Sequence, residues 1–242
     1  MKIALYNRLG YCRFDDQLGD DFTVCKAART SYGSSALKGE EKDRKLIRYL
    51  LKNRHTSPFE QCSISFNIRM PIFVMRQFVR HRTFRLNEES ARYHKMEDDF
   101  HIPKVWRIQS QKNKQMSEIV KESDDYIGSD PWNETNSGQV QEVCEHAYSV
   151  YEELLEQGVA REQARYILPV NLMTTIRVNI DLHNLMHFLR LRLDPHAQFE
   201  IRQLAYAMLR IAENRFPICM EAFIDFCPNI KEHVTEFEHE NS

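Results

Sequence analysis

Cys62-Ser-Ile-Ser-Phe-Asn-Ile-Arg-Met-Pro71 is the stretch that decides the fold. Apolar and polar side chains alternate in it, with Cys62, Ile64, Phe66 and Ile68 on one side. This period of two is expected of a strand with one face on a hydrophobic core. Pro71 ends the strand and suits the first position of a helix, so residues 72–81 are predicted to be helical.

Patterns of the same kind predict the elements on both sides of this strand. Met1–Tyr6 and residues 172–179 are predicted strands. Apolar residues three and four apart predict helices over residues 23–29, 40–53, 139–157, 160–168 and 197–215, and a further helix capped by Asp181. We therefore expect an α+β fold in which helices flank an antiparallel β-sheet.

Two polar segments interrupt or follow this pattern. Residues 107–138 are rich in Gln, Lys, Ser, Asp and Asn, and predict an exposed, tolerant insertion with a helix over 116–125 and a surface loop. After a last short helix, residues 231–242 are predicted to be a frayed polar tail. No Gly/Pro/Ser-rich linker or repeat divides residues 1–230, which predicts one domain.

Composition argues against several classes of protein. The formal net charge of −2 for 242 residues argues against a general nucleic-acid coat protein. The six cysteines are scattered without a Cys-x-x-Cys pair, which favours reduced thiols in a cytoplasm over a zinc site or a disulfide framework. No apolar run reaches the length of a membrane span, and the N-terminus is more typical of a strand than of a signal peptide, so we expect a cytoplasmic protein without membrane contact.

The segment Arg80–Arg92 reads Arg-His-Arg-Thr-Phe-Arg-Leu-Asn-Glu-Glu-Ser-Ala-Arg. Guanidinium groups at this density suit phosphate oxygens, which predicts an anionic ligand such as a nucleotide. On the predicted helix, Gln77 shares a face with Arg80 and His81, and the flanking arginines favour a neutral His81. The alternative is a solvated helix end whose arginines pair with acids such as Glu88.

A second group of candidates lies after Asp181. Arg192 falls at the margin of the apolar stripe of its helix, and a cation there needs a partner, either Glu200 or an anion from substrate. His183 and His187 lie four apart and could ligate a metal, but the glutamate of a zinc protease motif is missing. Hydrogen bonding or contact with a cofactor is favoured, and no metal site is predicted.

Several familiar nucleotide and nucleophile motifs are missing from the chain. It contains no phosphate-binding loop of the Gly-x-x-x-x-Gly-Lys-Ser/Thr type, no Gly-x-Gly-x-x-Gly and no Gly-x-Ser-x-Gly. Side chains would therefore have to hold a bound nucleotide. The same arginines would also serve a non-catalytic nucleotide- or RNA-binding protein, or pair with acids in a purely structural role, and the residue patterns leave these alternatives open.

Four blocks in register resemble the flavin-dependent thymidylate synthases over roughly residues 20–226. Arg80-His81-Arg82, then seven residues, then Ser90 is similar to their Arg-His-Arg-x7-Ser signature. The other blocks are residues 55–60 (His-Thr-Ser-Pro-Phe-Glu), 160–169 (Ala-Arg-Glu-Gln-Ala-Arg-Tyr-Ile-Leu-Pro) and 183–192 (His-Asn-Leu-Met-His-Phe-Leu-Arg-Leu-Arg).

The resemblance implies the fold of that family and a homotetramer with active sites between subunits. It implies methylation of dUMP to dTMP, with 5,10-methylenetetrahydrofolate as carbon donor, bound FAD as redox carrier and NADPH as reductant. No cysteine nucleophile is needed in that family, which agrees with the scattered cysteines.

Site residues carry over from the resemblance by position. The implied flavin contacts are Ser57, Arg80, His81, Arg82, Glu88, Asp181, His183 and His187. The implied dUMP contacts are Gln77, Arg80, Glu88, Glu89, Ser90, Ala91, Arg92, Arg165 and Arg192. Arg192 is the implied catalytic residue, which stabilises uracil ionised at N3. His55 falls in the region where folate is implied to stack over the flavin.

The chain departs from the family pattern in three places. The polar insertion 107–138 looks longer than in compact relatives, and we expect it to alter only the surface. Glu89 stands where an uncharged residue is frequent, and Ala91 replaces a frequent glycine. These two substitutions touch the implied substrate loop, so they leave room for altered affinity without removing a catalytic side chain.

Overall fold

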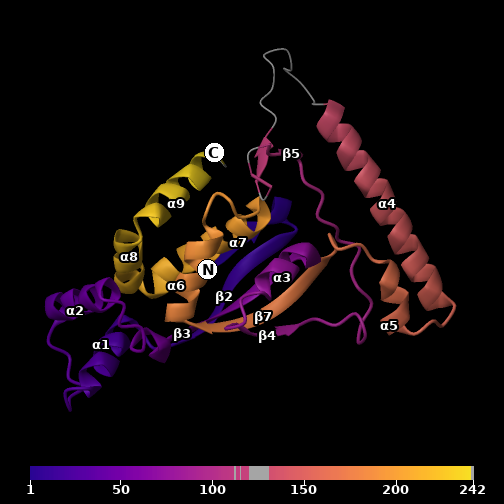
Figure 1. Ribbon diagram of the computed structural model, residues 1–242. Helices are drawn as coiled ribbons and strands as arrows, with labels where there is room; N and C mark the ends of the chain where they lie inside the picture. The colour runs from indigo at the N-terminus through magenta and orange to yellow at the C-terminus, as the bar shows by residue number, and fades with distance from the viewer. Residues whose placement is uncertain (112, 115, 120–130, 241–242) are drawn as a thin grey trace.

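A five-stranded antiparallel sheet forms the centre of the molecule (Figure 1). The computed structural model describes residues 1–111, 113–114, 116–119 and 131–240. The strand order is β1 (Lys2–Leu5), β2 (Gly10–Leu18), β3 (Ser63–Pro71), β7 (Met173–Asp181) and β4 (Arg85–Glu88). The predicted α+β class with an antiparallel sheet is confirmed, and β3 is the strand predicted from its alternation.

The two faces of the sheet differ in chemistry. The apolar face is fully buried and consists mainly of Ile64, Phe66, Ile68, Met70, Ile176, Val178 and Ile180. The opposite face is polar, and there Asn179 Nδ2 donates to Ser65 Oγ at 2.9 Å, across paired positions of β7 and β3. The apolar face alone therefore faces the main core.

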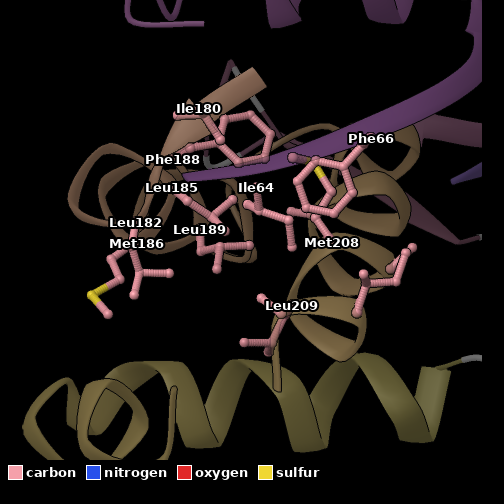
Figure 2. Packing of buried hydrophobic residues seen from close by; sticks show 14 of the residues in the cluster. Ile64, Phe66, Ile180, Leu182, Leu185, Met186, Phe188, Leu189, Met208 and Leu209 are labelled. Carbon is pink, nitrogen blue, oxygen red and sulfur yellow. The ribbon is translucent and has the colours of Figure 1, made fainter. Parts of the chain in front are cut away.

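Three helices cover the apolar face: α3 (Ile72–Phe78), α6 (Leu182–Arg192) and α7 (Phe199–Arg215). Helix α7 packs against β1, β2, α3 and α6. Figure 2 shows Leu185 and Leu189 of α6 among side chains of β3, β7 and α7. Burial of such a leucine stabilises the fold by roughly 1.5–3 kcal/mol, so this packing fixes α6 on the sheet.

The remaining helices form two groups at opposite sides of the sheet (Figure 1). Helices α1 (Asp21–Thr30), α2 (Glu40–Lys52) and α8 (Pro217–Phe226) pack together on one side, and α9 (Pro228–Glu240) follows α8. On the other side, α4 (Pro131–Glu156) packs against α5 (Arg161–Ala164) and η3 (Arg165–Ile167) around a small second core. Two further short 3-10 turns are η1 (Tyr6–Arg8) and η2 (Phe59–Gln61).

Strand β2 has no counterpart among the predicted elements. Its register shifts between Phe14 and Asp16, and such a bulge destroys the alternation on which strand prediction depends. The strand starts at Gly10, where an added Cβ would lie 2.4 Å from the carbonyl oxygen of Arg69. A glycine is therefore required for β2 to approach β3 this closely.

The arginine-rich segment is built differently from the prediction. Helix α3 ends at Phe78, so Arg80 and His81 lie in the following turn, and the shared helical face with Gln77 was wrong. Residues 85–88 then form β4, which pairs with β7 from Arg85↔Asn179 to Glu88↔Ile176. Edge pairing of this kind depends on a distant strand and leaves little local signal.

The polar insertion also differs from expectation. Strand β6 (Ser117–Ile119) pairs with β5 (Arg107–Gln109), so the predicted helix over 116–125 was wrong at these residues, and 120–125 lie outside the described residues. Helix α4 begins at Pro131, within the stretch predicted as loop. Proline suits the first position of a helix, which explains the start at Pro131. The packing of the later turns stabilises the whole helix, including its polar first turns.

The chain end predicted to fray is helical as far as residue 240. Helix α9 includes Ile230 and Phe237, both buried. The Phe237 ring lies 5.8 Å from that of Phe199 and 5.1 Å from that of Tyr206, measured between centroids. Phe237 thus packs on α7, and Glu238 beside it accepts from Tyr206 Oη at 2.6 Å. Within the described ranges, every helix is too short or too polar to cross a bilayer.

Candidate functional site

Arg192 and His81 meet at the end of α6. Arg192 is the last residue of α6, and its Nε donates to Nε2 of His81 at 2.8 Å. The His81 ring stands edge-on to Phe188, with centroids 4.8 Å apart and an interplanar angle of 81°. The fold therefore joins two predicted site residues that lie 111 positions apart in the sequence.

His81 is held in its neutral form. Burial lowers its pKa from 6.5 to about 4, and the nearby charges of Arg192 and His187 act in the same direction. Since Nε2 accepts from Arg192, the ring proton of the neutral imidazole sits on Nδ1, which is left as a donor. The predicted neutral state is confirmed, but burial and Arg192 cause it, instead of the flanking arginines Arg80 and Arg82.

The proposed ion pair between Arg192 and Glu200 does not form. Glu200 Oε1 instead accepts from Arg107 Nη2 at 2.7 Å, because α7 turns this carboxylate toward the insertion. Arg192 is half-buried, and burial lowers its pKa. None of the described residues bonds to its two terminal nitrogens. A half-buried guanidinium with open donors is suited to an anion supplied by a ligand.

The start of α6 brings further predicted residues to the same end of β7. Asp181 caps the helix, as predicted: its Oδ1 accepts from the Asn184 backbone N–H at 2.9 Å. His183 and His187 follow in the first turns of α6, and η2, just after Ser57, packs against this helix. Among the described residues no three His, Cys, Asp or Glu side chains converge as a metal site requires.

The segment after β4 that was predicted to contact substrate lies at the other end of β7. Thr174 Oγ1 donates to Glu88 Oε1 at 2.8 Å, and the Thr175 backbone N–H donates to the Glu89 carboxylate. Glu89 is thus bonded to the strand, which accounts for a charged residue at this position. Ser90 and Ala91 follow, half-buried, and Arg92 pairs with Glu162 of α5 at 3.2 Å. Arg165 directly follows α5 as the first residue of η3, and it is exposed to solvent.

The predicted site residues thus form two groups. Residues 88–92 and Arg165 lie near Met173, whereas Asp181, His81 and Arg192 lie at or beyond the opposite end of β7. Nine residues of strand span roughly 26 Å at about 3.3 Å per residue. A single copy of the chain therefore does not bring Arg165 to Arg192.

Arg80 and Arg82 remain available to a ligand. Both side chains are exposed, and neither forms an ion pair within the part of the chain that the structure describes. Glu88 and Glu89, their suggested partners, bond to β7 instead. The alternative of arginines neutralised by neighbouring acids is therefore wrong for Arg80 and Arg82. Two exposed guanidiniums that flank His81 in the sequence fit a ligand with phosphates and a heterocycle, such as FAD or a nucleotide.

The sequence patterns missed a set of polar side chains beside Gln77. Its amide nitrogen donates to Gln198, whose own nitrogen donates to Glu200 Oε2 at 2.8 Å. An open cleft of about 1330 Å³ lies along this set, with Phe73, Trp106 and Phe199 among its lining residues. The one available signal was the buried position of Glu200 beside Ile201 and Leu204, the first apolar residues of the amphipathic helix that Gln198 precedes.

Burial makes five of the six cysteines poor nucleophiles. Burial raises the pKa of Cys25 to about 11 and that of Cys62 to about 12, and the other buried thiols are protonated for the same reason where a shift is resolved. A thiol attacks only as its thiolate. All six cysteines are free, and five of them are buried.

Known proteins are similar to this chain in sequence and fold. Residues 14–218 match the family Thy1, described as thymidylate synthase complementing protein. The flavin-dependent thymidylate synthases of Thermus thermophilus and Kosmotoga olearia are 44% and 42% identical, over 88% and 90% of this chain and 75% and 91% of their own lengths. The chain shares 33% identity with the UMP/dUMP methylase PolB from Streptomyces cacaoi bound with 5-Br dUMP, with a TM-score of 0.80 over 90% of this chain and 95% of that one. The chain therefore belongs to the Thy1 family, that of the flavin-dependent thymidylate synthases.

Proposed function

We propose that this protein is a flavin-dependent thymidylate synthase that methylates dUMP to dTMP. The carbon comes from 5,10-methylenetetrahydrofolate and two electrons come from NADPH, so that dTMP, tetrahydrofolate and NADP⁺ leave. The new bond joins C5 of uracil to the methylene carbon, and C5 loses its proton. The family and the dUMP and UMP analogues named for the similar solved structures support this assignment.

The pairing of Arg192 with neutral His81 is the observation that carries the proposal. His81 takes one donor of Arg192 and adds no charge, so the full positive charge remains for the ligand. In a half-buried position this charge acts through a medium of low polarity, where it strongly favours a developing anion. Uracil ionised at N3 is such an anion, and its C5 is electron-rich enough to attack the methylene carbon without a cysteine nucleophile.

Residues at the α6 end would hold the flavin. Arg80 and Arg82 suit its phosphates, and the Nδ1–H of His81 would donate to an acceptor on it. Ser57, Asp181, His183 and His187 complete the flavin contacts at this end that carry over from the family. Glu88, the remaining carried-over contact, lies at the Met173 end and would come from a second copy. FAD, when bound, supplies the two-electron carrier between NADPH and the folate-derived carbon. The role of His55 beside the folate belongs to the same proposal. So do the dUMP contacts besides Arg192, which are Gln77, Arg80, Glu88, Glu89, Ser90, Ala91, Arg92 and Arg165.

The separation of the two groups supports a homotetramer with active sites between subunits. Arg165 and Arg192 both serve dUMP in the proposal, yet they lie at opposite ends of a strand of roughly 26 Å. A nucleotide is too short to reach both within one copy. A second copy that places its Arg165 end against the Arg192 end of the first would complete the site.

The free, mostly buried thiols support a cytoplasmic setting, since reducing compartments keep cysteines in this state. The formal charge of −2 gives no general attraction to nucleic acid, so the arginines are assigned to a small nucleotide.

The test is a reconstituted reaction. Purified protein should be yellow, or become so with added FAD, and should oxidise NADPH faster when dUMP is present. It should form dTMP from dUMP, methylenetetrahydrofolate and NADPH. A protein that cannot be loaded with FAD, or a loaded protein that forms no dTMP, would contradict the proposal.

A further inference from the structure

Four side chains form a continuous hydrogen-bonded chain from the insertion to Gln77. Arg107 Nη2 donates to Glu200 Oε1 at 2.7 Å, and Gln198 Nε2 donates to the second oxygen, Oε2, at 2.8 Å. Gln77 Nε2 then donates to Gln198 Oε1. The insertion therefore does more than alter the surface, because its Arg107 is bonded to a residue next to the proposed dUMP site.

The two residues at the start of this hydrogen-bonded series, Arg107 and Glu200, are fixed by contacts of their own. Glu200 is 5% exposed, and the Tyr6 hydroxyl donates to its backbone carbonyl at 3.2 Å. The guanidinium of Arg107 lies 4.9 Å above the Phe199 ring, and its Nε donates to Ser117 Oγ at 2.9 Å. Strands β5 and β6 thus both hold Arg107 in place, and Arg107 holds the carboxylate.

The chemistry of the four side chains allows only one assignment of donors and acceptors along this hydrogen-bonded series. Arginine only donates and an ionised carboxylate only accepts. Glu200 must therefore accept its second hydrogen bond from the amide nitrogen of Gln198. The oxygen of Gln198 then faces Gln77, which must present its own nitrogen. As a result Gln77 Oε1 is turned away from the chain, and no donor among the described residues bonds to it.

We propose that Glu200 is a positioning residue that fixes the orientation of the Gln77 amide, so that Gln77 Oε1 accepts a hydrogen bond from a donor group of the nucleotide. The inference rests on the proposed function, in which Gln77 contacts dUMP. It assigns to Arg107, within the insertion, the role of holding Glu200 as an acceptor.

Glu200→Gln tests the inference with a nearly isosteric change. The amide oxygen of the new side chain accepts from Arg107, so its nitrogen points to Gln198, and both glutamines flip in turn. Gln77 then presents a donor to a donor on dUMP. We expect the Kd of the flavin-loaded enzyme for dUMP, measured by calorimetry, to rise roughly tenfold or more, because a polar group that loses its partner weakens binding by about this factor.

The double variant Glu200→Gln with Gln198→Glu restores the original orientation of the Gln77 amide without restoring the original residues. Its new carboxylate at position 198 accepts from both neighbouring amides, so Gln77 again presents Oε1, and the net charge is unchanged. We expect the Kd for dUMP to return to within about threefold of the wild-type value. Glu221→Gln, on the distant surface of α8, is the matched control and should leave the Kd unchanged.

The outcomes separate the inference from the proposed function. A weakened single variant with a rescued double variant, both melting near the wild-type temperature, supports the inference. Wild-type affinity in Glu200→Gln overturns it, and so does a double variant as weak as the single one, since that would mean a merely structural role. A flavin-loaded wild-type enzyme that does not bind dUMP overturns the proposed function, and this inference with it.

Discussion

At the scale of single residues, the bond between Arg192 and His81 shapes the chemistry of the site. An arginine that donates to an imidazole excludes the imidazolium, because two cations would face each other across 2.8 Å. Each residue therefore fixes the state of the other: Arg192 keeps its charge, and His81 stays neutral with its proton on Nδ1. Neither state depends on the neighbouring Arg80 and Arg82.

Arg192→Ala should abolish turnover while flavin stays bound. Loss of a preorganised charge at a developing anion costs about a hundredfold or more in kcat. The flavin absorption band should persist, since the substitution removes none of the proposed flavin contacts. Formation of dTMP and the visible spectrum are the two measurements. Arg44→Ala, which removes an exposed arginine of α2, is the control; an Arg192→Ala enzyme as active as this control would contradict the proposed role.

His81 makes stability depend on pH below neutrality. Its pKa is about 4 in the folded chain and 6.5 ordinarily, so the unfolded state takes up the proton first as the pH falls. Stability from this group is present above about pH 6.5 and is lost toward pH 4. His81→Gln retains an acceptor for Arg192 but does not titrate. In urea unfolding at a series of pH values, it should lose less stability than the wild type between pH 6.5 and 4.

The comparison variant for this titration is His146→Gln, which removes an exposed histidine of α4. If His81→Gln and the wild type have parallel stability curves over this window, the assignment of the shift to His81 is wrong.

At the scale of elements, a distant carboxylate holds the start of α8. Asp21, at the beginning of α1, accepts from the backbone N–H groups of Ile218 and Cys219 at 3.1 and 2.8 Å. These are among the donors that the first turn of a helix leaves without a partner, and Asp21 is 5% exposed. The bond ties two helices that are nearly 200 positions apart.

Asp21→Ala should destabilise the protein by about 3 kcal/mol, because two buried N–H groups lose a charged acceptor. Asp20→Ala removes the exposed cap of α1, where Asp20 accepts from Thr23 at 2.8 Å, and should cost about 1 kcal/mol. Urea unfolding of both variants measures the difference. Equal losses would show that the contact across the core adds nothing beyond an ordinary cap.

At the scale of the whole molecule, the proposed homotetramer would bring the two groups of site residues together. The proposed homotetramer has four times the chain mass of 28.8 kDa, about 115 kDa. Light scattering coupled to gel filtration should return this mass for the flavin-loaded protein. A monomer of 28.8 kDa with full activity would contradict sites shared between subunits.

Sites shared between subunits also predict complementation. Arg165→Ala and Arg192→Ala should each be inactive as pure tetramers. After mixing, dissociation and reassembly, some sites receive Arg165 from one copy and Arg192 from another, so dTMP formation should reappear. Mixtures of two different Arg192 variants are the control and should stay inactive. If the first mixture stays inactive although hybrids form, both residues must serve the site from one copy.

The sequence by itself determined the elements whose signal is local. The alternation from Cys62 to Arg69 predicted β3, the cap at Asp181 and the stripe of Leu185 and Leu189 predicted α6, and four blocks of matching residues indicated the family. These signals are local because each strand or helix has its own period and its own end residues. They sufficed for the α+β class and for the candidate residues.

Only the tertiary structure decided which of those residues meet. Pairing with β7 made β4 out of an arginine-rich stretch, and the packing of α6 on the sheet brought Arg192 to His81 instead of to Glu200. The Arg107–Glu200 bond likewise joins an insertion to a helix 93 positions later. Such contacts depend on how elements pack across the core, and no pattern within one segment encodes them.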